Sequence, residues 1–401
     1  MKRSSVPALV LTVIFLAGLL FMCVMTFVTD GEDLYNSLRY MTKLSPYLGK
    51  DPDAFDMLNA RIRSFENEFS TGLYGTQALQ NTNARVQYAA GKQMLNMGSA
   101  NMVRLTSGQL YDITEKLDME PRADLVADFC DMVKDKYAVP VTVLYEHPSL
   151  YRNDQLPAGY EALDHLNENA DSYTARLASR EIDLMDSRDL LPCDDESLSR
   201  LIYATDQHWT CLAQLTLARD LAEHLGLDAS LLDTDKFECE SHPAAFLGKY
   251  GQRIGPEAAP PDDIDIWLPT YDTFITRYTL MNDIPQQAEG TFSEAAVRRG
   301  ELEHDEGCDY STMGYRVLGL TEDLDIYTNP TAPDVTVLLF KDSYSAGIGA
   351  YLSLTARNVI SVDLRKGART AGDWIREYSP DRVVIAFSPR MLTESDYSLT
   401  D

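Results

Sequence analysis

Hydrophobic and polar positions along this 401-residue chain follow different patterns in successive regions. An uncharged, mostly apolar run over residues 6–28 comes first, and it is long enough to span a bilayer as a helix. Residues 29–75 follow, with apolar residues at helical spacing between charged ones, as in "DPDAFDMLNARIRSFENEFS". This pattern predicts a membrane-proximal helical region.

From about residue 100, short apolar runs alternate with amphipathic segments. The runs "AVPVTVLYEHP" and "DVTVLLF" predict buried strands, whereas "ADLVADFCDMVKDKY" and "CLAQLTLARDLAEHLG" predict helices. Strands that alternate with helices indicate a layered α/β domain with a mainly parallel sheet. We place this domain at residues 76–401, with an irregular insertion or lid at 235–315, where Pro, Gly and Asp are frequent.

The N-terminus has the charge distribution of a signal anchor. Lys2 and Arg3 precede the apolar run, and acidic residues follow it directly. The positive-inside rule then puts residues 1–5 in the cytoplasm and the chain beyond about residue 29 outside. No small-residue cleavage site follows the run, so we predict an uncleaved, single-pass transmembrane helix. A cleaved signal peptide is the alternative, and it leads to the same compartment.

The chain is strongly acidic, with 62 Asp and Glu against 35 Lys and Arg and a formal net charge of −27. Nucleic acid and anionic lipid surfaces are therefore poor partners. Six cysteines are present, one of them within the apolar run, and the five others leave any disulfide pairing open. No CxxC or Cys/His spacing predicts a metal site, and no motif predicts a cofactor.

The stretch "YATDQHWT", Tyr203–Thr210, contains the first candidate for chemistry. Asp206 and His208 are two residues apart, so on an extended segment their side chains leave the same face. One interpretation is a surface Asp with a half-buried His packed by Trp209. The other is two members of a catalytic triad, which needs a nucleophile elsewhere in the chain.

Ser343 in "LLFKDSYSAG" is the candidate nucleophile. An apolar strand, a polar turn and small residues entering a helix are typical of the carboxyl edge of a parallel sheet, where active sites form. The backbone N–H of Ser343 is then placed to stabilise an oxyanion. A helix N-cap is the simpler role for this serine, and Ser345 is a competitor that we expect inside the helix. Together, the two segments favour acyl transfer through Ser343, His208 and Asp206.

These motifs resemble the DHHW family of SGNH-hydrolase-like proteins, which is related to the alginate O-acetylation proteins of the AlgX and AlgJ type. "YATDQHWT" is similar to the family's Tyr-x-x-Thr-Asp-His-His-Trp-Thr, and "KDSY" to its Lys-Asp-Ser turn. "FLGKYGQRIG" and "SVDLR" resemble two further family elements. Gln207 replaces the first His of the motif. The resemblance implies a Ser343–His208–Asp206 triad, and it makes Arg365 an active-site neighbour or a structural salt-bridge partner.

The resemblance implies a membrane-anchored, extracytoplasmic O-acyltransferase, with acetyl as the expected group, that modifies a cell-surface or secreted polysaccharide. The acceptor is then a glycan, and the implied partner is a multi-pass membrane acyltransferase that supplies acetyl groups. Two alternatives remain open. An acetylesterase would use the same triad, with water in place of the sugar hydroxyl, and a glycan-binding protein would keep the fold without catalysis.

Overall fold

The computed structural model describes residues 5–29, 75–97, 100–150, 153–281, 284–305, 308–319, 324–365, 369–389 and 398–401. The chain divides into two compact units, Met1–Val86 and Gln87–Asp401, and the boundary falls within α4 (Thr76–Ala89). In the first unit, α1 occupies Ser5–Thr29. No helix among the described residues is long and apolar enough to cross a membrane, so the anchor stays a prediction. The helical region predicted at 29–75 lies almost wholly outside the described residues.

An eight-stranded sheet lies at the centre of the second unit, in the order β5–β4–β13–β11–β12–β10–β8–β9. The pairs from β5 to β12 are parallel, and β10, β8 and β9 extend the sheet as antiparallel strands. The predicted, mainly parallel sheet is thus confirmed, with an antiparallel extension at one edge. The strands are β4 (Val141–Tyr145), β5 (Leu184–Asp186), β8 (Ile275–Met281), β9 (Ile284–Gly290), β10 (Leu324–Thr328), β11 (Thr336–Lys341), β12 (Asn358–Val362) and β13 (Arg382–Ala386).

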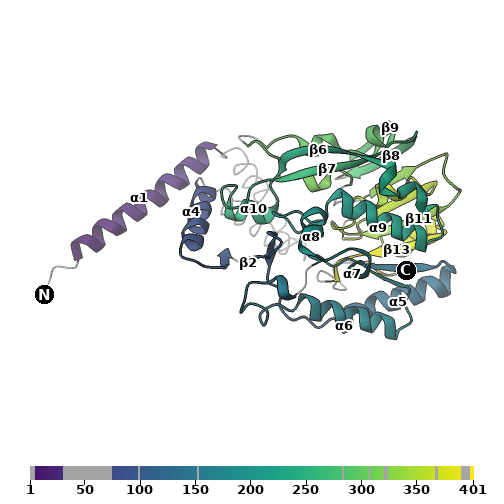
Figure 1. Ribbon diagram of the computed structural model, residues 1–401, viewed down its shortest axis with the longest axis horizontal. Helices are drawn as coiled ribbons and strands as arrows, with labels where there is room; N and C mark the ends of the chain where they lie inside the picture. The colour runs from purple at the N-terminus through teal and green to yellow at the C-terminus, as the bar shows by residue number, and fades with distance from the viewer. Residues whose placement is uncertain are drawn as a thin grey trace, which may run out of the picture. The chain divides into compact units, whose positions relative to one another are not determined.

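Both faces of this sheet are covered, as the unbroken apolar sequence of β11 requires. Val337 and Leu339 belong to one buried cluster, whereas Leu338 and Phe340 belong to the other. Successive side chains of a strand point to opposite faces, so each face has its own core. One core includes α9 (Cys211–His224) and α12 (Ile348–Leu352); the other includes α5 (Glu120–Tyr137), α6 (Leu166–Ser179) and α13 (Ala371–Tyr378). In Figure 1, α5 and α6 lie together at the bottom of the view and α9 lies above them.

The remaining elements are short and connect the layers. A three-stranded antiparallel sheet contains β1 (Met94–Met97), β2 (Ala100–Arg104) and β3 (Leu110–Asp112). Short helices are α7 (Ser187–Leu190), α8 (Asp195–Leu201), α10 (Lys249–Ile254) and α11 (Phe292–Ala295). The Thr210 hydroxyl caps α9 by accepting from the Ala213 N–H, which satisfies one of the free donors at the start of that helix.

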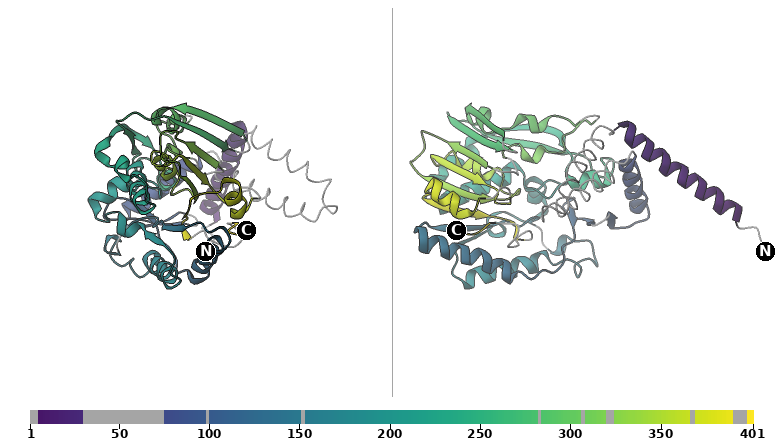
Figure 2. Two further views of the ribbon diagram at one scale, coloured as in Figure 1. Left: turned by 90° about the vertical axis from the view of Figure 1, so that its right-hand side faces the viewer. Right: turned by 180° about the vertical axis from the view of Figure 1, so that it is seen from behind.

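The prediction that residues 235–315 are irregular is wrong; that they form an insertion stays a prediction. This segment contains an antiparallel pair, β6 (Phe237–Phe246) and β7 (Asp262–Pro269), followed by the β8–β9 hairpin that joins the main sheet. In β7, buried Ile264, Ile266 and Leu268 alternate with more exposed residues. Period-two alternation is a strand signal, and here it lies directly after a Pro-rich turn. The β6–β9 region lies on the opposite side of the unit from α5 and α6 (Figures 1 and 2).

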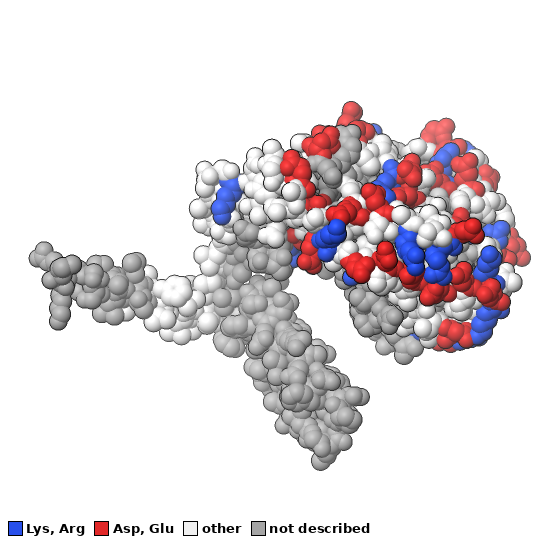
Figure 3. Space-filling view, turned by 90° about the horizontal axis from the view of Figure 1, so that it is seen from below, with Lys and Arg blue, Asp and Glu red and all other residues white. Residues whose placement is uncertain are grey.

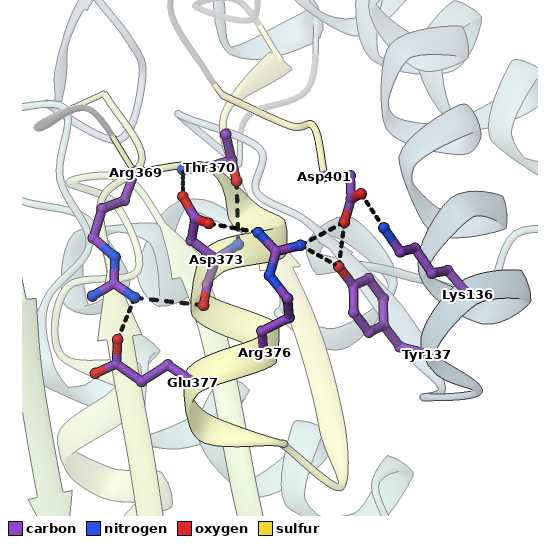
Figure 4. Close-up of polar contacts among 8 residues, drawn as sticks. All are labelled: Lys136, Tyr137, Arg369, Thr370, Asp373, Arg376, Glu377 and Asp401. Carbon is purple, nitrogen blue, oxygen red and sulfur yellow. Dashed lines mark hydrogen bonds and ion pairs between the residues drawn. The ribbon is translucent and has the colours of Figure 1, made fainter.

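The described C-terminal segment is fixed to the helical layer by polar contacts (Figure 4). The Asp401 carboxylate is contacted by Lys136 and Tyr137 at the end of α5 and by Arg376 of α13 at 2.7 Å.

Acidic side chains are spread over the face seen in Figure 3, interleaved with basic ones. All six cysteines are free thiols, so this structure contains no disulfide bond.

Candidate active site

The segment Tyr203–Thr210 is a turn rather than the end of an extended run. Ile202 and Trp209 form an isolated antiparallel bridge, and the Tyr203 N–H donates to the His208 carbonyl at 3.3 Å. This closure folds the intervening residues back, so that Asp206 and His208 face each other directly. Their proximity therefore comes from the bend, and not from the alternation of an extended strand.

Asp206 is held by donors on both carboxylate oxygens. Its Oδ1 accepts from His208 Nδ1 at 2.5 Å and from the His208 backbone N–H at 3.0 Å. Its Oδ2 accepts from the Lys249 N–H at 2.8 Å. Burial by itself would raise the pKa of Asp206, but the imidazole and these backbone donors outweigh burial and lower the pKa below its usual value. Asp206 is therefore ionised and keeps the proton of His208 on Nδ1.

The other imidazole nitrogen, His208 Nε2, is buried and has no hydrogen-bond partner among the described residues. With Nδ1–H committed to Asp206, Nε2 is the basic nitrogen of the neutral ring. A buried acceptor without a partner is uncommon and is often associated with a catalytic role. His208 is thus arranged to accept a proton from a group that enters the adjacent cavity.

Ser343 lies in the turn that follows β11, as the sequence predicts. Asp342 fixes this turn: its carboxylate accepts from the Tyr344 N–H at 2.9 Å and from the Ser388 N–H at 2.7 Å. The helix begins later than expected, at Ile348 of α12, so Ser345 is in the turn and not in a helix. Ser345 is fully buried and its hydroxyl donates to the Ala386 carbonyl, which removes it as a competing nucleophile.

A cavity of about 570 Å³ brings the predicted residues together, since Asp206, His208 and Ser343 all line it. They come from the turn before α9 and from the carboxyl edge of β11. Arg365, after β12, lines the same cavity and also pairs with the buried Asp363 at 2.5 Å. Arg365 is therefore both a neighbour of the candidate site and a structural salt-bridge partner. The cavity is also lined by Gln207, Lys249, Gln252, Thr312, Met313 and Tyr315.

Half of the residues that line the cavity come from the segment 235–315, which was predicted to be an insertion. The sequence did not identify them as site residues. The α10 helix packs directly against the 203–210 turn: the Gly248 N–H donates to Thr205 Oγ1, and the Tyr250 hydroxyl donates to Gln207 Oε1 at 3.0 Å. A Cβ atom on Gly248 would lie 2.2 Å from the Cβ of Asp206, so only glycine permits this approach. The "FLGKYG" stretch is the sequence signal that could have located α10.

The aromatic partners of His208 also differ from the expectation. Trp209 is fully buried and contacts Tyr344, with ring centroids 6.4 Å apart. The imidazole instead stacks on Tyr315, with centroids 4.0 Å apart and planes inclined by 7°. Tyr344 approaches the same imidazole at 5.2 Å. Two tyrosines from distant parts of the sequence therefore hold the plane of the His208 ring.

The fold and cavity define a class of layered α/β proteins with a polar pocket at the carboxyl edge of a parallel sheet. No protein-family model and no curated protein matches the sequence. A DHHW family protein from Eubacterium siraeum superposes with a TM-score of 0.55 and 15% identity, covering 76% of this chain and 94% of that one. PatB1 from Bacillus cereus, in a structure with a sulfonyl adduct, superposes with a TM-score of 0.56 and 14% identity. The superposition covers 75% of this chain and 97% of PatB1.

The O-acetyltransferase domain of Pseudomonas putida AlgJ aligns more loosely, with a TM-score of 0.39 and 14% identity over 72% of this chain and 91% of that domain. The first two superpositions show that this chain shares its fold with the DHHW family protein and with PatB1. The resemblance inferred from the motifs is confirmed at the level of the fold.

Proposed function

We propose that this chain is an O-acyltransferase, with acetyl as the transferred group, that acts through an acyl-enzyme on Ser343. One observation carries the proposal: Ser343, His208 and Asp206 line a single cavity, and His208 Nε2 has no partner among the described residues. A serine hydroxyl, a neutral imidazole and an ionised carboxylate are the groups that nucleophilic acyl transfer requires.

In the first half-reaction, Ser343 Oγ attacks the acyl carbon of the donor while His208 Nε2 takes the hydroxyl proton. Asp206 stabilises the imidazolium that forms. The bond from the acyl carbon to the leaving group then breaks, and the imidazolium returns the proton to that group. In the second half-reaction, an acceptor hydroxyl gives its proton to His208 Nε2 and attacks the acyl-enzyme, which frees Ser343.

The acceptor in this proposal is a polysaccharide, as the motif resemblance implies. The cavity is open to polar ligands, with Lys249, Gln252 and Thr312 on its wall beside the catalytic groups. An acetyl donor outside the cell implies delivery by a multi-pass membrane acyltransferase, and an N-terminal anchor would hold this chain beside that partner. The anchor, the extracytoplasmic location and this partner are parts of the proposal that rest on sequence alone.

The test uses the purified full-length protein with 4-nitrophenyl acetate and a panel of oligosaccharides. Mass spectrometry follows acetyl on Ser343, free acetate and acetylated sugar. Ser343→Ala and His208→Ala are the loss-of-function variants. Ser345→Ala is the matched control, because this neighbouring hydroxyl is buried outside the cavity.

The expected result is acetylated sugar that disappears in Ser343→Ala and His208→Ala and persists in Ser345→Ala. Acetate without acetylated sugar, lost in the same two variants, identifies an esterase with the same catalytic groups. Equal signals from the wild type and all variants would refute serine catalysis and favour a glycan-binding protein.

A further inference from the structure

Glu146 is a buried acid that the proposed mechanism does not use. It directly follows β4 and is fully buried, and neither of its carboxyl oxygens accepts a hydrogen bond from a donor among the described residues. A buried, ionised carboxylate without donors is expensive, since water can no longer solvate it. The position and protonation state of Glu146 therefore need an explanation.

The sheet register places Glu146 beside the nucleophile turn. Val143 of β4 pairs with Ile385 of β13, so the residue after β4 lies near Ser388, beyond the end of β13. On the other side of β13, the carboxylate of Asp342 accepts from the Ser388 N–H. The carboxyl ends of β4, β13 and β11 thus meet at one point, directly before Ser343.

Asp342 and Ser345 are the polar side chains next to Glu146, although neither donates a hydrogen bond to its carboxyl oxygens. The Ser345 hydroxyl already donates to the Ala386 carbonyl at 3.2 Å. An ionised Asp342 is only an acceptor. If Glu146 were ionised as well, two negative carboxylates would share a buried site with no proton between them. The arrangement becomes favourable when Glu146 keeps a proton and its carboxyl O–H donates a hydrogen bond to the ionised Asp342.

The charges around the pair indicate which acid holds the proton. Burial raises the pKa of Glu146 well above its usual value, and the negative charge of Asp342 raises it further, whereas Lys341 opposes both. Burial also raises the pKa of Asp342. The Ser388 and Tyr344 N–H groups and the nearby Arg365 favour its ionised form and lower the pKa, whereas the negative charge of Asp363 raises it. Asp342 has backbone donors and Glu146 has none, so the proton resides on Glu146.

We propose that Glu146 is a protonated positioning residue whose carboxyl O–H donates to Asp342 and so holds the turn that carries Ser343. The inference rests on the proposed function, because it assigns Glu146 a role in placing the nucleophile. Glu146 is not among the residues that line the cavity. It acts through Asp342, which adjoins Ser343 in the chain, and it links β4 to β11 across the end of β13.

The protonation state is tested directly by infrared spectroscopy of the full-length protein at pH 7. The expected result is a carbonyl band of a buried carboxylic acid that disappears in Glu146→Gln and persists in Glu196→Gln, a substitution of an exposed acid on α8. A spectrum in which Glu146→Gln loses no such band means that Glu146 is ionised, which would overturn the inference. This measurement is independent of any enzymatic activity.

The positioning role is tested by the rate at which phenylmethylsulfonyl fluoride labels Ser343. In this reaction Ser343 Oγ bonds to sulfur, fluoride leaves, and His208 Nε2 takes the hydroxyl proton. Gln at position 146 keeps an N–H donor for Asp342, so Glu146→Gln is expected to label at close to the wild-type rate. Glu146→Leu keeps the volume but loses the donor, and we expect it to label about tenfold or more slowly.

Labelling of Glu146→Leu at the wild-type rate would refute the positioning role. If Glu146→Leu does not fold, the comparison of wild type with Glu146→Gln still decides, because a large loss of labelling in the folded Gln variant contradicts a role as donor. If the wild type itself is never labelled on Ser343, the proposed function fails, and the infrared result then shows separately whether Glu146 is protonated.

Discussion

The phenol ring of Tyr315 lies flat against the imidazole of His208, with the ring planes inclined by only 7° and the centroids 4.0 Å apart. Tyr315 belongs to the 3₁₀ turn Gly314–Arg316, more than a hundred residues after His208. Its ring also packs on Phe246 at 5.9 Å, which fixes it from behind. The stack restricts rotation of the imidazole and offers a π face to the imidazolium that acyl transfer would form.

Replacing Tyr315 tests this stack. In Tyr315→Leu, the imidazolium loses the π face and the ring gains freedom, so we expect kcat to fall about tenfold. Tyr315→Phe keeps the ring and should restore the rate. The measurement is kcat for acetyl ester turnover. An unchanged kcat in Tyr315→Leu would leave Tyr315 with a packing role only.

Gly248 permits the contact between α10 and the Asp206 turn, and its replacement should disturb that contact. In Gly248→Ala, the new methyl would lie 2.2 Å from Asp206 Cβ and 2.6 Å from the Thr205 carbonyl oxygen. One of the two segments must move, at a cost of about 1–3 kcal/mol in the free energy of unfolding. We expect a lower Tm and a larger loss of activity than the stability change explains, because Asp206 is displaced.

Gly300→Ala is the matched control for this substitution, since a Cβ at that position has open space around it. Thermal unfolding and ester turnover of the two variants give the comparison. Equal behaviour of Gly248→Ala and Gly300→Ala would show that the backbone of α10 yields without affecting the site.

The catalytic candidates could be predicted from the sequence because their signals are local. Asp206 and His208 lie in one short motif, and Ser343 follows an apolar strand at the position where parallel sheets place active-site turns. The parallel strands were predictable for the same reason. The fully buried core of β11 is an unbroken apolar run, and the order of strands and helices then limits the topology.

The other residues of the site could not be predicted, since they reach it through contacts between distant segments. Tyr315 lies in a region whose Pro and Asp content hid the alternation of β7, and nothing local indicates that it meets His208. Glu146 follows a strand that was predicted correctly, but its burial beside Asp342 depends on the order of β4, β13 and β11 in the sheet. Residue spacing along the chain does not encode that order.

Two ion pairs that do not line the cavity should differ greatly in their contribution to stability. Arg298 Nη2 donates to Asp325 Oδ1 and Thr279 Oγ1, each at 2.6 Å, and all three side chains are buried. Arg298→Ala leaves the Asp325 carboxylate buried with one cation fewer, so we expect a loss of about 3–5 kcal/mol in the free energy of unfolding.

The exposed cluster at Asp401 provides the comparison (Figure 4). Its ion pairs with Lys136 and Arg376 lie in solvent, where water and salt screen them. Asp401→Ala should therefore cost much less than Arg298→Ala in urea unfolding at the same ionic strength. A second variant, Arg298→Met with Asp325→Leu, should recover most of the lost stability, because it removes the unpaired charge. No recovery would mean that the Arg298 hydrogen bonds contribute more than the charge balance.

Asp262 should make stability depend on pH between about 4 and 6. Its carboxylate accepts from the Ala204 N–H at 2.8 Å and the Thr205 N–H at 2.9 Å, which tethers β7 to the turn before Asp206. Burial is the main cause that raises the pKa of Asp262 to about 6, against these donors. In the unfolded chain the pKa of an Asp is about 3.9.

Between these two pKa values, the folded protein holds a proton that the unfolded chain has released, so raising the pH favours unfolding. The free energy of unfolding attributable to Asp262 should fall by about 2 kcal/mol from pH 4 to pH 7 and then stay level. Asp262→Asn cannot ionise, so the difference between wild type and variant isolates this contribution from Glu240 and Asp401, whose lowered pKa values act in the opposite direction. Urea unfolding at several pH values measures it, and a difference that does not change with pH would show that Asp262 is ionised throughout, held by its backbone donors.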